Sequence, residues 1–263
     1  MTLRVAVFGA GGRMGATVCA AVAGDPDLDL VAAVDPHHAE FDLGEVTRDQ
    51  SLPAIQVSRS GESLDATTVD VAIDFTVRDA AKKNLDWLAA NGVHAVVGTT
   101  GFTEKDYARL RKQFTSSNCI VAPNFAIGAV LMMRFAELAA PYFESAEIIE
   151  LHHGGKVDAP SGTAMLTAER LAKASDDWID DPTREEVVKG ARGGLAGPIP
   201  VHSVRLQGMV AHQEVILGTM GQTLSIRHDS YDRSSFMPGV LLAVKKVGET
   251  PGLTIGLDQV LGL

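Results

Sequence analysis

The sequence has little cysteine, no long apolar run and fewer basic than acidic residues. Its only cysteines, Cys19 and Cys119, form no CxxC pair and have no spacing suited to zinc, so we expect two free thiols in a reducing cytoplasm and no metal site. No apolar run approaches the roughly 18 residues of a membrane span. The start, Met1–Arg4, lacks the basic region and apolar core of a signal peptide. These absences predict a cytoplasmic protein that does not enter a membrane.

The charge balance narrows the classes of partner. The 263 residues contain 23 Lys and Arg against 33 Asp and Glu, a formal net charge of −10. Nucleic acid is therefore a poor candidate, because its phosphates bind clustered basic side chains. A local basic pocket for a small anion is still compatible with this charge, so acidic metabolites remain candidate substrates. With 46% hydrophobic and 21% charged residues, the composition is that of a folded chain of one large or two small domains.

The first half of the chain alternates between strand-like and helix-like segments. Short apolar, β-branched runs predict strands at 3–8, 28–34, 69–73, 94–97 and 119–121, with helices at 14–23, 79–91 and 103–114. Such nearly continuous apolar strands are typical of a parallel sheet covered by helices on both faces. The polar segment 37–65 contains Pro53 and is predicted to hold one short strand and loops.

The second half has a different character. We expect helices at 130–143, 161–173 and 238–247, a strand at 146–151, a long Gly-rich and Pro-rich excursion at 176–200, and alternating strands at 201–206, 213–217 and 223–227. Alternation of apolar and polar residues indicates antiparallel pairing. The predicted fold class is therefore α/β, with an N-terminal doubly wound parallel sheet followed by a smaller α+β domain whose sheet is mostly antiparallel.

A glycine-rich turn separates the first strand from the first helix. Gly9, Gly12 and Gly15 follow a GxxGxxG pattern, and Asp35 ends the second strand 20 residues after Gly15. Glycines allow a pyrophosphate to approach the backbone, and an acid at the next strand end can accept hydrogen bonds from the adenosine ribose. The pattern predicts dinucleotide binding, the alternative being a merely tight turn. Arg13 could bind an adenosine 2′-phosphate that Asp35 would repel, so both NADH and NADPH remain candidates.

Two later strand ends also qualify as ligand contacts. Open α/β sheets bind ligands at the carboxyl ends of their strands. Asp74-Phe75-Thr76 closes one strand and Gly98-Thr99-Thr100-Gly101 closes another, where the glycines would let a ligand lie against the backbone. Taken alone, each segment is more often an ordinary turn than a ligand contact.

The stretch 150–164, ELHHGGKVDAPSGTA, contains the most informative residues. His152 and His153 end a strand, Lys156 follows, and Ser161-Gly162-Thr163 begins a helix. The bland interpretation is one core histidine, one surface histidine and a solvated lysine. However, a helix start with free N–H groups and hydroxyls binds carboxylates well. A histidine and a lysine beside it would form a proton-donating pocket for a carboxylate-bearing substrate.

These motifs together resemble the 4-hydroxy-tetrahydrodipicolinate reductase (dihydrodipicolinate reductase) family. The resemblance covers essentially the whole chain, and its most specific part is the pattern His152-His153-x-x-Lys156-x-Asp158-Ala159-Pro160-Ser161-Gly162-Thr163-Ala164. It implies a Rossmann-type cofactor domain over residues 1–125, joined by two hinges to a substrate-binding and tetramerisation domain over 126–237. The C-terminal helical segment 238–263 would return to the cofactor domain.

The resemblance also implies an activity and a set of site residues. The activity is NADH-dependent or NADPH-dependent reduction of 4-hydroxy-tetrahydrodipicolinate, a small dicarboxylate, to tetrahydrodipicolinate with loss of water, in the diaminopimelate route to lysine. His152 would exchange protons and Lys156 would donate one, while His153, Gly162 and Thr163 would bind substrate carboxylates. The cofactor residues would be Gly9, Ala10, Gly11, Gly12, Arg13, Met14, Asp35, Gly98, Thr99, Thr100, Ala122, Pro123, Asn124 and Phe125.

The sequence departs from the family pattern in two places, and two alternative functions remain open. Gly154 and Gly155 stand where larger residues are expected, which would loosen the loop before Lys156, and the segment after Asp35 is longer than in compact members. The first alternative is another two-domain NAD(P)-dependent reductase, which would not need the His-His-x-x-Lys pattern. The second is a dinucleotide sensor without catalysis, which would be free to lose His152 or Lys156.

Overall fold

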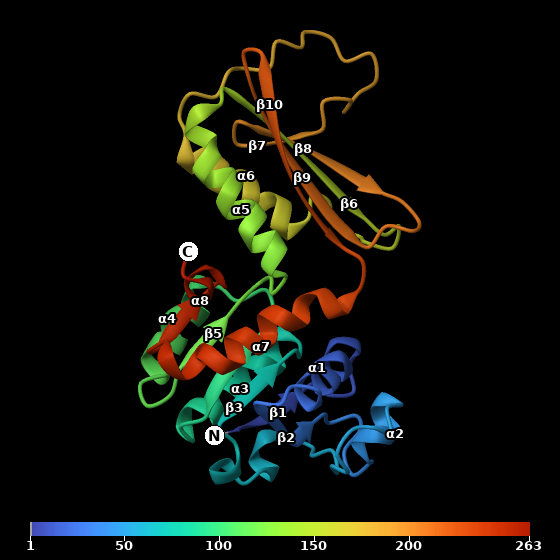
Figure 1. The fold of residues 1–263 in the computed structure, drawn as a ribbon, viewed down its shortest axis with the longest axis vertical. Coiled ribbons are helices and arrows are strands. Elements are labelled where there is room, and N and C mark those ends of the chain that lie inside the picture. The colour runs from blue at the N-terminus through green and yellow to red at the C-terminus, as the bar shows by residue number, and fades with distance from the viewer. Residues whose placement is uncertain (1) are drawn as a thin grey trace. The chain divides into compact units, whose positions relative to one another are not determined.

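The computed structural model describes residues 2–263 and divides them between two units (Figure 1). Of the described residues, the first unit consists of 2–125 and Phe236–Leu263, and the second of Ala126–Ser235. Each unit has its own sheet. None of the helices within residues 2–263 combines the length and apolar character that crossing a membrane requires.

The sheet of the first unit is entirely parallel. Its strands are β1 (Leu3–Phe8), β2 (Leu28–Val34), β3 (Val71–Asp74), β4 (His94–Val97), β5 (Cys119–Val121) and β11 (Leu253–Ile255). They lie in the order β11-β5-β4-β3-β1-β2. The strands β3 and β5 are buried throughout, as strands covered on both faces must be. The order reverses at β1, which has β2 on one side and β3 on the other, so the turn after β1 opens at the switch point where such sheets bind ligands.

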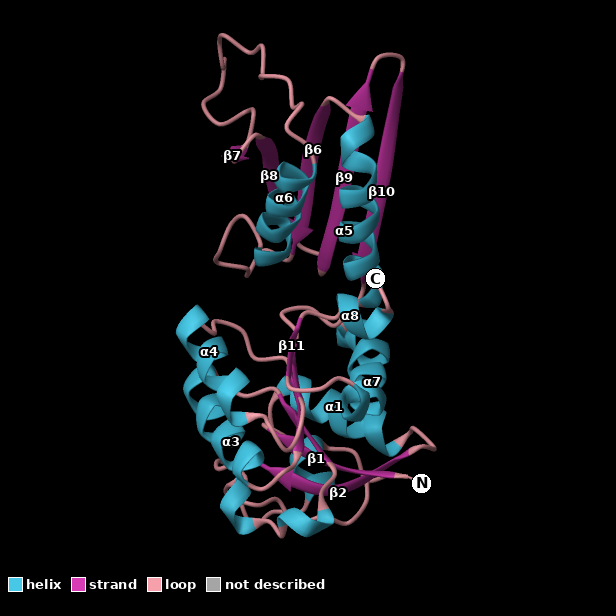
Figure 2. Ribbon diagram, turned by 90° about the vertical axis from the view of Figure 1, so that its left-hand side faces the viewer, coloured by secondary structure: helices cyan, strands magenta, loops and turns pink. Residues whose placement is uncertain are grey.

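Helices cover both faces of this sheet, as the sequence predicted. They are α1 (Arg13–Ala23), α3 (Arg78–Ala90), α4 (Glu104–Gln113) and α7 (Met237–Lys246). Figure 2 shows α3 and α4 on one face and α1 and α7 on the other. The start of α4 is held by a capping box in which Thr103 and Asp106 bond to each other's backbone N–H groups.

The segment 37–65 corrects one prediction. In place of a strand it contains the short helix α2 (Leu43–Thr47), the 3₁₀ turn Gly61–Ser63 and two isolated bridges, Val34 to Ser58 and Asp42 to Gln56. Some backbone N–H groups here are satisfied by nearby side chains: the Asp42 carboxylate, for example, accepts from the N–H of Gly44. Such local bonds compete with ladder pairing, and the pairing of this segment with β2 is limited to the bridge between Ser58 and Val34.

The C-terminal segment also differs from its prediction as a helical segment. The segment 238–263 is not one helix: α7 ends at Lys246, β11 pairs in parallel with β5, and a short helix α8 (Asp258–Leu261) follows. The strand β11 is only three residues long and lies between Gly252 and Gly256, both of which have positive φ. A run this short carries no readable period, and its partner β5 supplies the hydrogen bonds that define it as a strand.

The second unit contains a mixed sheet with helices on one face. Its strands are β6 (Ser145–His152), β7 (Gly194–Ala196), β8 (Ile199–Arg205), β9 (Ala211–Thr219) and β10 (Gln222–Ser230), in the order β10-β9-β6-β8-β7. Pairing is antiparallel except between β6 and β8, so the mostly antiparallel prediction is confirmed. The helices α5 (Ile127–Ala139) and α6 (Gly162–Ala174) lie on the same face (Figure 2).

Candidate active site

Glycines at key positions of the turn after β1 leave no room for a side chain there. Gly9 has a φ of 80°, and a Cβ there would lie 3.1 Å from the carbonyl oxygen of Phe75. A Cβ on Gly15 would come within 1.9 Å of the carbonyl oxygen of Gly9. Glycine is therefore required both for the backbone angle and for the close packing of α1 on the turn. These are the conditions under which the start of a helix can closely approach a bound phosphate.

The amino-terminal end of α1 suits an anion. The helix begins at Arg13, its N-cap Gly12 makes no side-chain capping bond, and its first turn contains no acidic residue. The first N–H groups of a helix have no partner within it, and together with the helix dipole they favour negative charge. Arg13 is exposed and Met14 half-buried beside this end. The turn and helix start therefore fit the pyrophosphate of a dinucleotide.

Asp35 holds this turn to the end of β2. One of its carboxylate oxygens accepts from the backbone N–H of Gly11 at 3.0 Å, and the other accepts from the N–H of His37 at 2.9 Å. The imidazole of His38 lies against the same carboxylate, with Nδ1 3.3 Å from Oδ1. A Cβ on Gly11 would lie 2.2 Å from that nitrogen. Asp35 is thus a structural tie as well as a candidate ribose acceptor.

Asp74 joins three segments at the carboxyl edge of the sheet. This fully buried carboxylate accepts from the N–H and the hydroxyl of Thr76, from the amide of Asn84 and from the hydroxyl of Thr99. Burial raises the pKa of Asp74, although these hydrogen bonds oppose the shift. Because the hydroxyl of Thr99 also donates to the carbonyl of Thr76 at 2.8 Å, its contact with a ligand would be through the backbone.

Phe75 orders the remaining candidate cofactor residues. A Cβ on Gly98 would lie 2.1 Å from its ring, and the ring centroid of Phe125 is 5.9 Å away. The N–H of Ala122 donates to the carbonyl of Val97. The segments 98–100 and 122–125, which follow β4 and β5, are therefore held together beside the end of β3, with Thr100 exposed.

In the second unit, His152 lies at the end of β6 above a buried acid. Glu150 precedes it by two residues and so projects from the same face of the strand. The Nδ1 atom of His152 is 2.5 Å from the Oε2 atom of Glu150, whose side chain is completely buried. Burial lowers the pKa of His152; Glu150 opposes this, and the charges of Lys156 and Arg205 add to it. The lowered pKa favours the neutral imidazole at neutral pH.

Lys156 is held close to the same place by an acid of its own loop. Its Nζ atom lies 2.8 Å from both carboxylate oxygens of Asp158, and its N–H donates to the carbonyl of His153. The bond from Lys156 lowers the pKa of Asp158. His153 is exposed. The adjacent Gly154 and Gly155 have no positive φ, so the backbone does not demand glycine at either position.

The start of α6 is joined to the His152 side. Ser161 is its N-cap, with a hydroxyl that accepts from the N–H of Ala164 at 3.1 Å, and its own N–H donates to Glu150 at 3.2 Å. The first turn contains no acidic residue, Gly162 is exposed and Thr163 is half-buried. Glu150 therefore links His152 to a helix start suited to a carboxylate, and Lys156 lies on the loop that connects the two.

Sequence reasoning missed Arg205, which lies on the adjacent strand β8. Its guanidinium forms a two-pronged ion pair with Glu150, with distances of 2.9 and 2.8 Å, and also donates to the carbonyl of Asp158 at 2.7 Å. Glu150 lies at the start of the stretch 150–164, and the sequence assigned it no role. The position of Glu150, two residues before a strand-end histidine, could have predicted that the two side chains share a face of the strand. No local pattern points to Arg205, which is 55 residues from Glu150 in the sequence.

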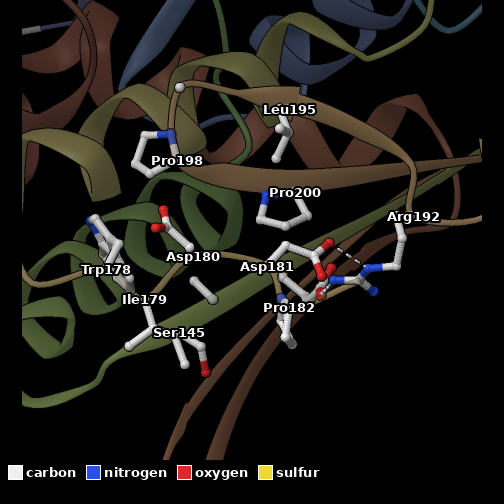
Figure 3. Close-up of a pocket in the computed structure, with 13 residues that line it drawn as sticks. Ser145, Trp178, Ile179, Asp180, Asp181, Pro182, Arg192, Leu195, Pro198 and Pro200 are labelled. Carbon is white, nitrogen blue, oxygen red and sulfur yellow. Dashed lines mark hydrogen bonds and ion pairs between the residues drawn. The ribbon is translucent and has the colours of Figure 1, made fainter. Parts of the chain in front are cut away.

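A separate cavity of about 270 Å³ opens at the other end of β6 (Figure 3). Trp178, Ile179 and three prolines line it, and its arginine, Arg192, is already paired with Asp181 and Glu147 at 2.8 and 2.6 Å. Ser145 at this cavity and His152 are the first and last residues of β6, about 23 Å apart at the rise of a strand. The cavity is thus remote from the His152 site.

His94 and His212 have structural partners, and both cysteines are buried. His94 Nδ1 accepts from the N–H of Asn118, and His212 lies between Asp229 and the N–H of Val210. Cys19 and Cys119 are free and buried, and burial raises the pKa of Cys19 to about 12. Within residues 2–263, no three His, Cys, Asp or Glu side chains are grouped so as to hold a metal ion.

A parallel sheet with a glycine-rich turn at its switch point, followed by an α+β unit with a His–Lys site, defines the class of two-domain Rossmann-type oxidoreductases. Family models narrow the class: "Dihydrodipicolinate reductase, N-terminus" matches residues 3–125 and "Dihydrodipicolinate reductase, C-terminus" matches residues 128–261. The chain therefore belongs to the dihydrodipicolinate reductase family.

Individual relatives agree with this assignment. The chain is 49% identical to the 4-hydroxy-tetrahydrodipicolinate reductase of Cutibacterium acnes, over 99% of each chain, and 48% identical to that of Mycolicibacterium vanbaalenii, over 99% of this chain and all of the relative. A solved dipicolinate-bound dihydrodipicolinate reductase from Paenisporosarcina sp. TG-14 superimposes with a TM-score of 0.86 at 41% identity, over 98% and 99% of the two chains. An amine dehydrogenase from Mycobacterium smegmatis shares the fold alone, with a TM-score of 0.67 at 14% identity, over 98% and 96%.

Proposed function

We propose that this protein reduces 4-hydroxy-tetrahydrodipicolinate to tetrahydrodipicolinate with NADH or NADPH, in the diaminopimelate route to lysine. The reaction consumes a hydride and a proton and releases water. The observation that carries the proposal is the grouping of His152, Lys156 and the Ser161-capped start of α6 in a chain of this family. A proton-exchanging group and a cation beside a carboxylate site match the needs of an acidic substrate that is reduced and dehydrated.

The first unit would bind the cofactor. Gly9–Met14 would hold its pyrophosphate, Asp35 its adenosine ribose, and Gly98–Thr100 with Ala122–Phe125 its nicotinamide end. The fit rests on the tight glycine-rich turn, the uncapped start of α1 and the buried Asp35. When bound, the nicotinamide supplies the hydride, and the protein supplies orientation and electrostatics. Asp35 disfavours a 2′-phosphate and Arg13 favours one, so use of both cofactors is expected.

The second unit would bind the substrate. A small dicarboxylate would place one carboxylate on the N–H groups of Gly162 and Thr163 at the start of α6 and meet His153 from the exposed side. The Paenisporosarcina relative binds dipicolinate, which is a dicarboxylate of the same class. The absence of any acid from the first turn of α6 keeps this end attractive to anions.

Lys156 and His152 would divide the proton chemistry. A lysine ammonium can hold negative charge that develops on the substrate and supply a proton to it. The lowered pKa of His152 keeps its imidazole neutral, so its Nε2 atom can accept a proton and return it later. In this division Lys156 is the proton donor and His152 the group that exchanges protons.

We also propose a homotetramer in the cytoplasm. The support for the assembly is the family resemblance together with the sheet face opposite α5 and α6, where Ile149 and Ile216 are only half-buried. The cytoplasm suits a chain with two unpaired thiols. Light scattering after gel filtration should give about four times the 27.8 kDa of one chain, and a monomeric mass would contradict this part.

The direct test follows absorbance of NADH and of NADPH with substrate generated in situ from pyruvate and aspartate semialdehyde by the preceding synthase. Oxidation that depends on the synthase is the expected result, and the ratio of the two rates measures cofactor preference. If both cofactors bind and neither is oxidised, the proposed activity is wrong, and a dinucleotide sensor or another reductase takes its place.

A further inference from the structure

One buried ion pair connects the parts of the His152 site. The Oε1 atom of Glu150 accepts from Arg205 and from the N–H of Ser161, and its Oε2 atom accepts from Arg205 and meets Nδ1 of His152. The partners come from β6, from β8 and from the start of α6. A carboxylate with no exposed surface and partners on three elements has little freedom to move.

We propose that Glu150, held by Arg205, is the positioning residue of this site: it fixes the ring of His152 and keeps that ring's proton on Nδ1, so that Nε2 faces the substrate as an acceptor. The proposal rests on the proposed role of His152. An ionised carboxylate can only accept hydrogen bonds, so the 2.5 Å contact requires Nδ1 to be the donor. A neutral imidazole has a single N–H, which leaves the lone pair on Nε2.

The charges around the two groups support this arrangement. Burial would raise the pKa of Glu150, but hydrogen bonds from Arg205, Ser203 and His152 outweigh burial and lower it, so the carboxylate stays ionised. The charged groups that act on His152 are Glu150 on its own strand, Lys156 on the following loop and Arg205 on β8. Glu150 is the only one of the three that favours the imidazolium. It would therefore also stabilise the ring after Nε2 accepts a proton.

Arg205 also helps to position Lys156, through Asp158. The Nη2 atom that bonds to Glu150 also donates to the carbonyl of Asp158, and the carboxylate of Asp158 holds Nζ of Lys156. His152 and Lys156 are therefore both positioned from one guanidinium–carboxylate pair. A guanidinium suits this positioning role, because its N–H donors have fixed directions and so set the orientation of a hydrogen bond as well as its length.

The opposite face of β6 supplies a matched control. Glu147 lies three residues before Glu150, and its carboxylate binds Nε2 of His202 at 2.5 Å and the guanidinium of Arg192 at 2.6 Å. Glutamate, histidine and arginine therefore form a second cluster, built around another glutamate of β6 and next to the remote cavity. Glu147→Gln removes the same charge as Glu150→Gln without touching the His152 site.

The first experiment needs no activity. In protein labelled with ¹⁵N-histidine, with the His152 signals assigned by their loss in His152→Gln, we expect a neutral ring protonated on Nδ1. In Glu150→Gln the ring should become a mixture of both tautomers, and in Glu147→Gln it should match wild type. A wild-type ring protonated on Nε2 would overturn the proposal even if Glu150→Gln failed to fold.

The second experiment measures catalysis. Glu150→Gln should lower kcat by about 100-fold, the usual scale for an orienting partner of a functional histidine, and should change the pH profile of kcat. The Kd for NADH should stay within about 2-fold of wild type, because the glycine turn is in the other unit. Glu147→Gln should keep the wild-type profile, provided that gel filtration shows wild-type assembly, because Glu147 lies opposite Ile216 on the sheet face proposed for the tetramer. A fully active Glu150→Gln with an unchanged profile would contradict the positioning role, whereas an inactive wild type would contradict the proposed function alone.

Discussion

The carboxylate of Asp35 accepts a 3.0 Å hydrogen bond from the backbone N–H of Gly11, which ties the end of β2 to the turn after β1. The other oxygen of the same carboxylate accepts from the N–H of His37. One buried side chain therefore both shapes the glycine-rich turn and places a negative charge where the proposed adenosine ribose would lie. Neutralising it should have two separable consequences.

Asp35→Asn should change cofactor preference. Removing the negative charge relieves repulsion of a 2′-phosphate, so the NADPH/NADH ratio of kcat/KM should rise by about 5-fold or more. Activity with both cofactors should fall, because an amide oxygen can replace only one of the two acceptors of Asp35. Asp65→Asn, a neutralised carboxylate on the amino-terminal side of β3, should leave the ratio unchanged. No change of the ratio in Asp35→Asn would show that Asp35 does not set preference.

Lys156→Ala should separate turnover from cofactor binding. Loss of a proton donor typically costs about 100-fold or more in rate, whereas the Kd for NADH, measured by its fluorescence, should be unchanged. Lys173→Ala is the control, because Lys173 is exposed and bound only to Glu169, one turn earlier in α6. Equal losses of turnover and cofactor affinity in Lys156→Ala would contradict the assigned role.

Asp74→Asn tests the tie between the three strand-end segments. All the groups that meet Asp74 are donors, so an amide would place its own N–H₂ against at least one of them. We expect the unfolding free energy to fall by about 1–3 kcal/mol and KM for the cofactor to rise. Asp86→Asn, which removes a half-exposed ion pair with Arg109, should cost less than about 0.5 kcal/mol. Equal stability losses in the two variants would show that Asp74 does not hold the three strand-end segments together.

Stability should decline in mild acid, partly through His94. Burial lowers the pKa of His94 below 6.5, with Asp70 opposing, and its Nδ1 atom accepts from the N–H of Asn118. Because the unfolded chain binds this proton more readily, the stabilisation is complete above about pH 6.5 and is lost as the pH falls towards the folded-state pKa. Tm should therefore drop between about pH 7.5 and pH 5.5, and less steeply in His94→Gln. Parallel curves for the two proteins would argue against this origin.

The strands β1, β2, β4 and β5 could be predicted to the residue, because each is a short, mostly apolar run with a clear end: glycine follows β1 and β4, Asp35 follows β2, and Ala122-Pro123 follows β5. The strand β11 could not, since three residues between two glycines become a strand only beside β5. In the segment 37–65 the predicted strand is replaced by isolated bridges, while polar side chains such as Asp42 and Asp49 bond to nearby backbone N–H groups.

The candidate site could be predicted in part, where its residues are close together in the sequence. His152, Lys156 and Ser161 occur within one short stretch, so their proximity follows from local chain geometry. The pairing of Glu150 with Arg205 depends on the alignment of β6 with β8, in which His152 lies opposite Arg205. No local pattern encodes that register. The roles of His152 and Lys156 in catalysis stay predictions.

The most direct test of the central claim is the fate of the hydride. NADH carrying deuterium at its transferable C4 position should be oxidised in the presence of the synthase and its substrates, and mass spectrometry should find the deuterium in tetrahydrodipicolinate. Lys156→Ala should reduce the amount of labelled product in proportion to its loss of turnover. Cofactor oxidation without label in the product, or no oxidation by a wild-type protein that binds NADH, would contradict the account.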